Sequence, residues 1–310
     1  MVGSSVPAQP LGRRGIRFAW ILVMLLSTLS APARAQQAKK IDVLQIGTSG
    51  SLALNASGTK EETALDALKS FIKTETGFDN EIIQQKNYEE LVQKMASGQL
   101  HLGVFQGFEF AWAQEENAKL QPLALAVDVY HYRYAHLMVR RDSKFADFAA
   151  LQGQTLSIPQ VGQRHLHLFV ERLSQGNGKP LEAFFSKIAT PENIEDALDD
   201  VVDGAVQAAV VDRVGLEAYK RRKPGRFARL KELTHSQAFP PPLVAYYDEV
   251  LDQQTRQRFQ LGLLTANSKE KGQRLLNLFK LTGFAVPPKD FVQVLAETRK
   301  AYPPSKEAVK

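Results

Sequence analysis

The sequence predicts an α/β fold divided into two lobes, and two observations support this prediction. From residue 41 onward, short β-type runs alternate with amphipathic helical patterns, which is typical of a largely parallel sheet covered by helices. The segment 36–310 also exceeds roughly 250 residues, the length beyond which a single core tends to split. A second lobe is expected to begin near Arg140-Arg141-Asp142-Ser143, after a longer alternating run.

The strands are predicted from short apolar or alternating runs. In order, they are Ile41–Ile46, Glu81–Gln85, Leu100–Phe105, Leu123–Val127, Tyr132–Val139, Thr155–Ile158, Ala208–Val211 and Leu243–Tyr247. The first strand is expected to end in a small polar loop, Gly47–Ser51. Pro240-Pro241-Pro242 is expected to be extended and stiff, because proline fixes φ and disfavours helix in the residue before it.

Helices are predicted where apolar residues recur at helical spacing. These stripes lie within Leu65–Ile72, Tyr88–Met95, Gly107–Glu116, Leu166–Leu173, Ile194–Val202, Phe259–Leu264, Leu275–Phe279 and Phe291–Leu295. The segment Lys220–Arg226, by contrast, is predicted to be a basic, proline-containing surface turn whose charges face solvent.

Residues 1–35 have the pattern of a cleavable signal peptide. Three arginines precede an apolar run, Phe18–Leu29, and Ala33-Arg34-Ala35 supplies small residues at the two positions that a signal peptidase reads. A membrane-spanning helix needs about 20 apolar residues, and this run is shorter. We therefore expect cleavage before Gln36 and export to the periplasm.

Charge and cysteine content exclude several classes of protein. The formal net charge is +6, but residues 1–35 hold four of the 39 Lys and Arg and none of the 33 acidic residues. The remainder is nearly balanced, whereas a nucleic-acid-binding protein needs a clustered basic face. The absence of cysteine excludes disulfides, thiolate chemistry and a lipid-anchored N-terminus, and it suits an oxidising compartment.

Common catalytic motifs are missing from the sequence. It contains no GxxxxGK[ST] phosphate loop, no GxGxxG after a strand and no HExxH. His165 and His167 form an HxH pair, but a helix would point the two imidazoles in different directions. We expect His165 or His167 to face the ligand cleft and the other to face solvent. No cofactor or metal is predicted.

The order of these features resembles the phosphonate/phosphite-type periplasmic binding proteins, the PhnD-like branch of the type 2 solute-binding fold. The resemblance covers roughly Ile41 to Leu264 and rests on an ordered set of short motifs rather than on a single one. The motifs are Tyr88-Glu89-Glu90-Leu91, Ser97–Phe105, Val139–Ser143, Leu151-Gln152-Gly153, Ala209–Asp212 and Ser236–Val244.

The resemblance implies a two-lobed type 2 periplasmic-binding-protein fold with two interdomain crossovers. Lobe 1 is expected to comprise 36–133 plus 243–310, and lobe 2 to comprise 134–242. It also implies a monomeric solute-binding protein, not an enzyme, that closes around a small, phosphonate-like anion and delivers it to an ABC permease in the inner membrane.

Three loops at the carboxyl ends of strands are expected to bind this ligand, because such loops lead into helix N-termini that favour anions. The first contains Thr48, Ser49 and Ser51. The second contains Gln163, Arg164 and His165, where the family usually has a Ser-Thr-Ser-Gly cluster. The third is Asp212-Arg213, in which Asp212 by resemblance points at the cleft and otherwise serves as an N-cap.

Further contacts are predicted from Tyr88, Gln106, Phe110 and Tyr132, which lie near loop ends or the first crossover. Phe110 stands where the family has a tyrosine, so the hydroxyl of that position is lost. Two alternatives stay open: an enzyme on the same fold that uses acid and base residues in the cleft, and a ligand-sensing or partner-binding protein without a transporter.

Overall fold

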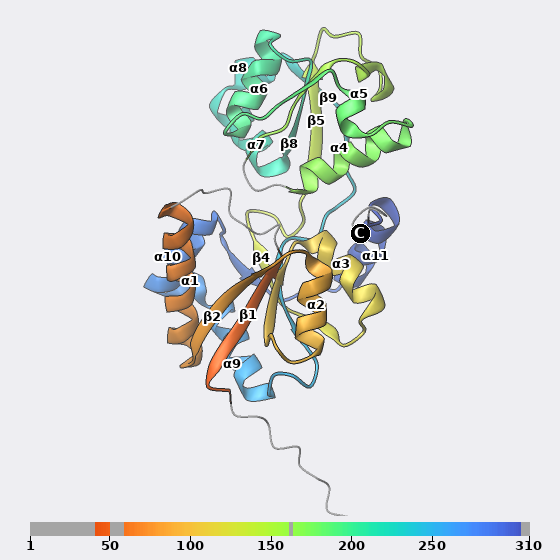
Figure 1. Cartoon of the computed structure of the whole chain (residues 1–310). Helices are drawn as coiled ribbons and strands as arrows, with labels where there is room; N and C mark the ends of the chain where they lie inside the picture. The colour runs from red at the N-terminus through yellow and green to blue at the C-terminus, as the bar shows by residue number, and fades with distance from the viewer. Residues whose placement is uncertain (1–40, 50–58, 161–163, 305–310) are drawn as a thin grey trace, which may run out of the picture. The chain divides into compact units, whose positions relative to one another are not determined.

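Two β-sheets, each flanked by helices, organise the chain (Figure 1). The structure, a computed structural model, describes residues 41–49, 59–160 and 164–304. The predicted signal peptide, Ser51 and Gln163 lie outside the described residues. The segment from Lys40 onward forms one compact unit.

The first sheet has the strand order β11-β4-β10-β3-β1-β2. Its strands are β1 (Val43–Ser49), β2 (Asp79–Gln85), β3 (Leu102–Phe105), β4 (Leu120–Val127), β10 (Leu243–Tyr247) and β11 (Gly283–Ala285). The helices packed with it are α1 (Thr59–Thr76), α2 (Tyr88–Ala96), α3 (Gly107–Glu116), α9 (Gln253–Leu264), α10 (Glu270–Phe279) and α11 (Phe291–Ala301).

The second sheet has the order β7-β6-β8-β5-β9. Its strands are β5 (Ala135–Arg140), β6 (Thr155–Ser157), β7 (Lys187–Ala189), β8 (Ala208–Asp212) and β9 (Leu230–His235). Its helices are α4 (Arg164–Gly176), α5 (Leu181–Phe184), α6 (Ile194–Asp203), α7 (Arg213–Arg222) and α8 (Pro224–Phe227), and Figure 1 shows them around this sheet. Two 3-10 turns, Ala149–Leu151 and Ala266–Ser268, complete the described elements.

The chain crosses between the sheets twice, as the fold prediction required. It leaves the first sheet after β4 and enters the second at β5, then leaves after β9 and returns at β10, which inserts between β3 and β4. The two crossovers pair with each other: the Arg133 N–H donates to the Phe239 carbonyl at 3.0 Å, and the Phe239 N–H donates to the Arg133 carbonyl at 2.9 Å. This pairing fixes where both segments enter the second sheet.

Several local predictions were wrong. Both sheets are mixed rather than largely parallel, because β10 runs antiparallel to its neighbours in the first sheet and β5 does so in the second. β1 continues to Ser49, so Thr48 and Ser49 belong to a strand and not to the loop. Short elements β7, β9, β11 and α5 were missed because three to six residues carry little periodic signal.

The basic segment Lys220–Arg226 is also not a turn of solvated charges. It forms the end of α7 and most of α8; Lys220 and Arg221 are exposed as predicted, but Arg222, Lys223 and Arg226 pair with acids of α6. Lys223 Nζ lies 2.6 Å from an Asp199 carboxylate oxygen, and Arg226 Nε lies 2.6 Å from the other. The acids lie about 25 residues earlier in the chain, so only the packing of α6 against α7 brings these charges together.

The cores show how the C-terminal helix joins the two sheets. Phe291 and Leu295 of α11 pack in a core cluster of the first sheet, whereas Tyr302, which follows the helix, packs in a cluster of the second. The Tyr302 ring stacks on Phe239 at 4.4 Å between centroids. The Trp112 indole N–H of α3 donates to the Tyr302 carbonyl at 2.7 Å. The region around Phe239 therefore holds side chains from both halves of the fold.

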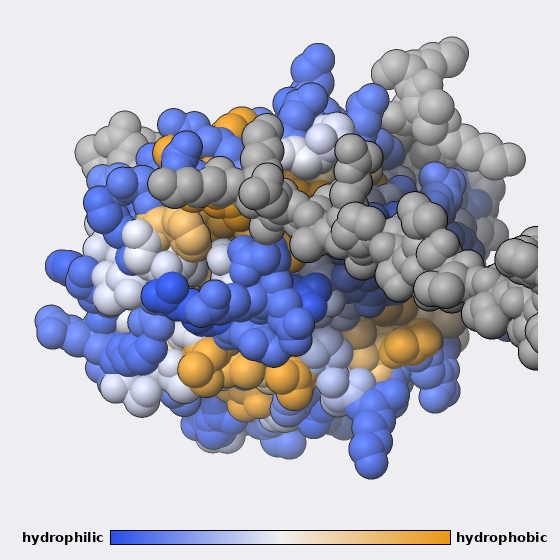
Figure 2. Space-filling view, turned by 90° about the horizontal axis from the view of Figure 1, so that it is seen from below, coloured by the Kyte–Doolittle hydropathy of each residue, from blue (hydrophilic) through white to orange (hydrophobic). Residues whose placement is uncertain are grey.

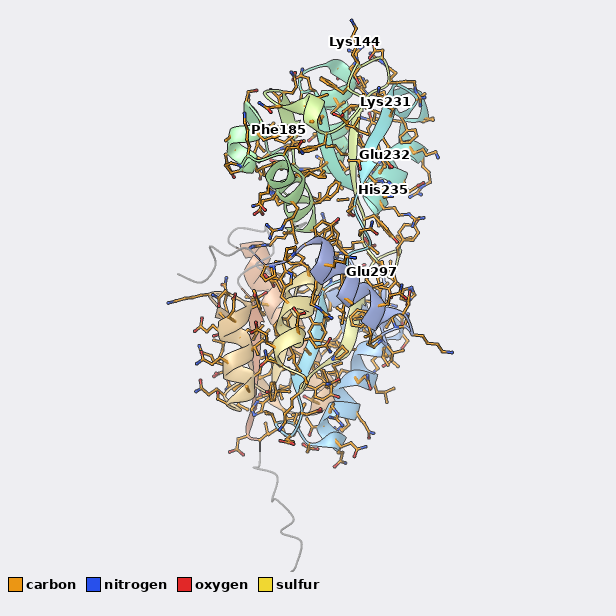
Figure 3. The ribbon with its side chains drawn as sticks, turned by 90° about the vertical axis from the view of Figure 1, so that its right-hand side faces the viewer. Lys144, Phe185, Lys231, Glu232, His235 and Glu297 are labelled. Atoms are coloured by element: carbon orange, nitrogen blue, oxygen red, sulfur yellow. The ribbon has the colours of Figure 1, made fainter. Side chains whose placement is uncertain are left out.

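A β-bulge in β9 gathers three titratable side chains on one face. Leu137 pairs with Thr234, but Met138 pairs with Glu232, so the register shifts by one residue. Glu232 and His235, both labelled along β9 in Figure 3, thus share a face although they lie three residues apart. The imidazole Nδ1 atoms of His136 and His235 lie 2.6 and 2.7 Å from the two carboxylate oxygens of Glu232.

On the face of the molecule drawn in Figure 2, apolar side chains reach the surface in separate patches among hydrophilic ones. Exposed apolar residues scattered in this way are normal for a globular protein. Among the described residues, no helix has the length and apolar character needed to cross a membrane.

Gly107 permits the close approach of α3 to the second crossover, so we expect a larger residue at this position to destabilise the protein. A Cβ atom on Gly107 would lie 2.0 Å from the Pro240 carbonyl oxygen and 2.6 Å from that of Pro241. Gly107→Ala should therefore destabilise the protein by about 1–3 kcal/mol, as over-packing does, in urea unfolding. Gly176→Ala is the control, because a Cβ there meets nothing within 4 Å. Equal stability of the two variants would contradict the contact.

The Glu232 cluster predicts how the contribution of Glu232 to folding stability changes with pH. Burial raises the pKa of Glu232, but the hydrogen bonds and charges of His136 and His235 outweigh this effect and the pKa is lowered overall. A carboxylate with a lowered pKa stabilises the folded state above its unfolded pKa, and this contribution is lost as the pH falls through the folded pKa. Glu232→Gln should cost less than about 1 kcal/mol at pH 6, since the group is partly exposed.

The difference between Glu232→Gln and the parent protein should shrink as the pH is lowered from 6 to 3, in unfolding curves recorded across this range. Glu297→Gln serves as the control, because the Glu297 carboxylate accepts a hydrogen bond from Gln293 in the same helix rather than from a histidine. A difference that stays constant down to pH 3 would contradict the assignment.

Candidate functional site

A pocket lies where the first crossover meets the start of α7. The antiparallel pairing of β5 with β8 places Ala135 opposite Asp212, and the Arg213 N–H donates to the Tyr134 carbonyl at 3.2 Å. The residues before β5 are thereby held against the carboxyl end of β8. The pocket is lined by Asp128, Tyr130, Tyr132, Arg133, Tyr134, Asp212, Arg213 and Val214.

Asp212 is the last residue of β8 and the N-cap of α7. Its Oδ1 atom accepts a hydrogen bond from the Gly215 N–H at 2.7 Å, which satisfies one of the free donors at the helix start. The cap fixes the orientation of the carboxylate. Asp212 is half-buried and lines the pocket, so it acts both as the cap and as a pocket residue.

Two arginines bring positive charge to the pocket. The Arg213 guanidinium lies 4.0 Å from the centre of the Tyr130 ring, a cation–π contact. Burial lowers the pKa of the Arg133 guanidinium, whereas the negative charges of Asp212 and Asp128 act in the opposite direction. The lining thus combines two guanidiniums with two carboxylates.

Tyr132 connects the pocket to the first sheet. Its hydroxyl donates to Asp290 Oδ1 at 2.7 Å, just before α11. Burial, followed by this hydrogen bond, raises the pKa of Tyr132 above its ordinary value. The phenol therefore stays protonated near neutral pH and acts as a donor with a fixed partner.

The end of β1 forms a different cluster from the pocket. The buried Ser49 hydroxyl donates to Glu109 Oε2 at 2.7 Å, and the Gln106 backbone N–H donates to the same oxygen at 3.3 Å. Glu109 is buried in the first turn of α3, where a negative charge is favoured by the helix dipole. The chain's own carboxylate thus occupies this helix N-terminus. Thr48 lies beside this cluster in β1, half-buried.

At the start of α4, Arg164 is exposed and His165 is buried. The His165 ring packs edge-on against Phe239 with centroids 5.5 Å apart. Its Nε2 atom is buried and makes no hydrogen bond within the described residues. Burial, and then the charge of Arg133, lower the pKa of His165 well below its usual range, so the imidazole is neutral. His167 is exposed, as the helical geometry requires.

Two aromatic residues of the predicted set lie in or beside the core of the first sheet. Phe110 has no exposed surface and packs against Phe105 and Phe291, with ring centroids 6.0 and 6.5 Å away. Tyr88 is half-buried at the start of α2, and its ring centroid lies 5.5 Å from that of Trp112. The structure places Phe110 among packing residues and not in the pocket lining.

The structure therefore divides the predicted set. It brings Tyr132 and Asp212 into one pocket, and it joins Ser49 and Gln106 through Glu109, with Thr48 beside them in β1. The remaining described candidates, Tyr88, Phe110, Arg164 and His165, lie elsewhere. Sequence reasoning placed Arg213 in the third candidate loop but missed Arg133 as a pocket residue. The run Tyr130-His131-Tyr132-Arg133-Tyr134 was a signal for Arg133, since aromatic and cationic residues gathered at a crossover are unusual in a strand interior. Within the described ranges, no three His, Asp or Glu residues are placed to hold a metal ion.

The chain is similar to known proteins that bind solutes for ABC transporters. Residues 51–290 match a family model described as ABC transporter, phosphonate, periplasmic substrate-binding protein. A Xanthomonas citri protein solved bound to ATP is 17% identical, with a TM-score of 0.58, covering 87% of this chain and 100% of its own. No curated protein matches at the level of sequence.

Two further solved structures share the fold. PhnD1 from Prochlorococcus marinus, in complex with methylphosphonate, is 13% identical with a TM-score of 0.54, and the match covers 84% of this chain and 97% of that one. A binding protein component of an ABC phosphonate transporter from Pseudomonas aeruginosa is 15% identical with a TM-score of 0.52, covering 84% and 87%. At these identities the likeness concerns the fold.

The two roles of Asp212 are separable by mutation. Asp212→Ala removes the cap and should lower the free energy of unfolding by about 1 kcal/mol, whereas Asp212→Asn keeps a capping oxygen and should stay within a few tenths of the parent value. Urea unfolding of both variants measures the difference. If the asparagine variant is as destabilised as the alanine variant, the carboxylate charge and not the cap holds the start of α7.

Proposed function

Because the chain belongs to the family of phosphonate periplasmic substrate-binding proteins of ABC transporters, we propose that it is an exported, non-catalytic protein that binds a small anion. The anion is held between lobe 1 (36–133 plus 243–310) and lobe 2 (134–242), and the closed protein delivers it to a membrane permease. The predicted boundaries fall between β4 and β5 and between β9 and β10, the two places where the chain changes sheets.

The observation that carries the proposal is the pocket at the paired crossovers. Residues from the first crossover and from the start of α7 line it together, so a solute that binds there contacts the segments about which the two sheets would move. A solute that contacts the closed form better than the open form shifts the population towards closure. Solute binding would then produce the closed form of the protein that is presented to the permease.

The localisation follows from the leader over 1–35. Removal of this segment before Gln36 would release a monomeric protein into the periplasm. Cell fractionation followed by intact-mass measurement is the test of this part of the proposal. A periplasmic protein whose mass corresponds to 36–310 supports it, and a protein that keeps residues 1–35 in the cytoplasm contradicts it.

The binding function predicts a ligand-dependent stabilisation and closure. Native mass spectrometry of the protein purified from cells should reveal a co-purified small anion without assuming its class. At a free concentration 100 times its Kd, that anion should stabilise the folded protein by about 2.7 kcal/mol, and small-angle scattering should record a smaller radius of gyration.

Two outcomes would contradict this function. If a bound anion leaves the radius unchanged, closure is wrong. If the anion is consumed with turnover, the protein is an enzyme on this fold and not a carrier. The matched control is the protein stripped of ligand by unfolding and refolding, which should recover the larger radius.

A further inference from the structure

Arg133 is the most constrained residue of the first crossover. Its backbone N–H and carbonyl both bond to Phe239 of the second crossover. Ala135, two residues later, begins β5 and pairs with Asp212. The Cα position of Arg133 is therefore fixed on two sides, and its half-buried side chain lines the pocket.

The guanidinium of Arg133 lacks hydrogen-bond and ion-pair partners among the described residues. Across residues 41–49, 59–160 and 164–304, its side chain forms no hydrogen bond and no ion pair. Arginine keeps its proton under all ordinary conditions and carries five N–H donors. Removing such a group from water is costly unless an acceptor replaces the water. Burial of Arg133 has already lowered its pKa.

The other charged groups of the pocket each have a partner. Asp212 caps α7, and the Arg213 guanidinium lies over the Tyr130 ring. Asp128 accepts a hydrogen bond from the Val129 N–H at 2.8 Å. Asp128 and Asp212 act on Arg133 through space without forming an ion pair with it. Neither guanidinium donates a hydrogen bond among the described residues, but Arg213 is held by the Tyr130 ring. Arg133 is thus the cation of the lining that neither a carboxylate nor an aromatic ring engages there.

The size of the pocket limits what enters it. Its accessible volume is about 10 Å³, close to the space that one water molecule occupies. A whole solute does not fit, but one or two oxygen atoms at the end of a solute do. Oxygen atoms that carry a negative charge are the groups that a guanidinium fork binds best.

We propose that Arg133 binds the oxyanion end of the transported solute inside this pocket, while the rest of the solute extends out of it. The inference rests on the proposed solute-binding function and adds the residue and the ligand chemistry: a terminal phosphonate, sulfonate or carboxylate group. The anion-binding group is accordingly part of the crossover itself, and not of the α3 N-terminus, which Glu109 occupies.

The test compares variants by isothermal titration with three probes, namely methylphosphonate, methanesulfonate and acetate. The parent protein should bind at least one of them. Arg133→Met should weaken that binding roughly 10- to 100-fold, the loss expected for one charge-assisted contact. Arg133→Lys should fall between the two, because lysine keeps the charge but not the planar fork.

Arg140→Met is the matched control. Arg140 lies on β5, seven residues after Arg133, and it pairs at the surface with Asp142, so its loss should leave binding unchanged. Urea unfolding of each variant establishes that it is folded, and if Arg133→Met does not fold, Arg133→Lys carries the comparison.

The outcomes separate this inference from the proposed function. Binding that Arg133→Met retains within threefold of the parent overturns the role of Arg133 but leaves the carrier function standing; if Arg133→Met does not fold, the same limit applies to Arg133→Lys. A parent protein that binds none of the three probes and carries no anion by native mass spectrometry overturns the proposed function as well. A loss equal in Arg140→Met overturns the role of Arg133 too, since long-range charge alone would then explain the effect.

Discussion

Two backbone hydrogen bonds between Arg133 and Phe239 hold the crossovers side by side, and most of the arrangement around the pocket depends on them. Once these segments are paired, β5 and β9 enter the second sheet as neighbours and β10 returns between β3 and β4. The same pairing places Phe239 where rings from α3, α4 and the C-terminal segment meet. Backbone geometry, and not a particular side chain, therefore decides where the two halves of the fold approach each other.

The distribution of buried charge follows from this geometry. One half of the fold neutralises a helix N-terminus with its own carboxylate, Glu109, which Ser49 and the Gln106 backbone stabilise. The crossover, by contrast, leaves a cation, Arg133, beside Asp212, the carboxylate that caps α7. A buried group that lacks a partner is costly, so the asymmetry indicates where an external ligand is most favourable. The neutral His165 nearby adds no charge to compete with it.

Much of the fold was predictable because its elements carry local signals. The ten-residue α3 begins and ends where the sequence predicts, and strands β2, β8 and β10 lie within two residues of their predicted bounds, since each has a clear apolar pattern between turn residues. Strand order was not predictable, because an antiparallel insertion such as β10 leaves no trace in the periodicity of a single strand.

The site was predicted less well than the fold. Asp212 and Tyr132 were among the sequence candidates and line the pocket, whereas the position of Arg133 there depends on pairing with a residue more than a hundred positions away.

By itself, the sequence determined the α/β class, the leader pattern, the positions of the longer helices and strands and the resemblance to periplasmic binding proteins. Each of these properties depends on neighbouring residues or on the sequence as a whole, so it can be predicted from periodicity, composition and the order of motifs. Only the tertiary structure decided which charges meet. Lys223 and Arg226 pair with acids on α6, and the β9 bulge places Glu232 beside two histidines. The crossovers leave the guanidinium of Arg133 without a hydrogen-bond or ion-pair partner among the described residues. Electrostatic and hydrogen-bond energies depend on distances of a few ångströms, and these distances are set by contacts that are remote in sequence.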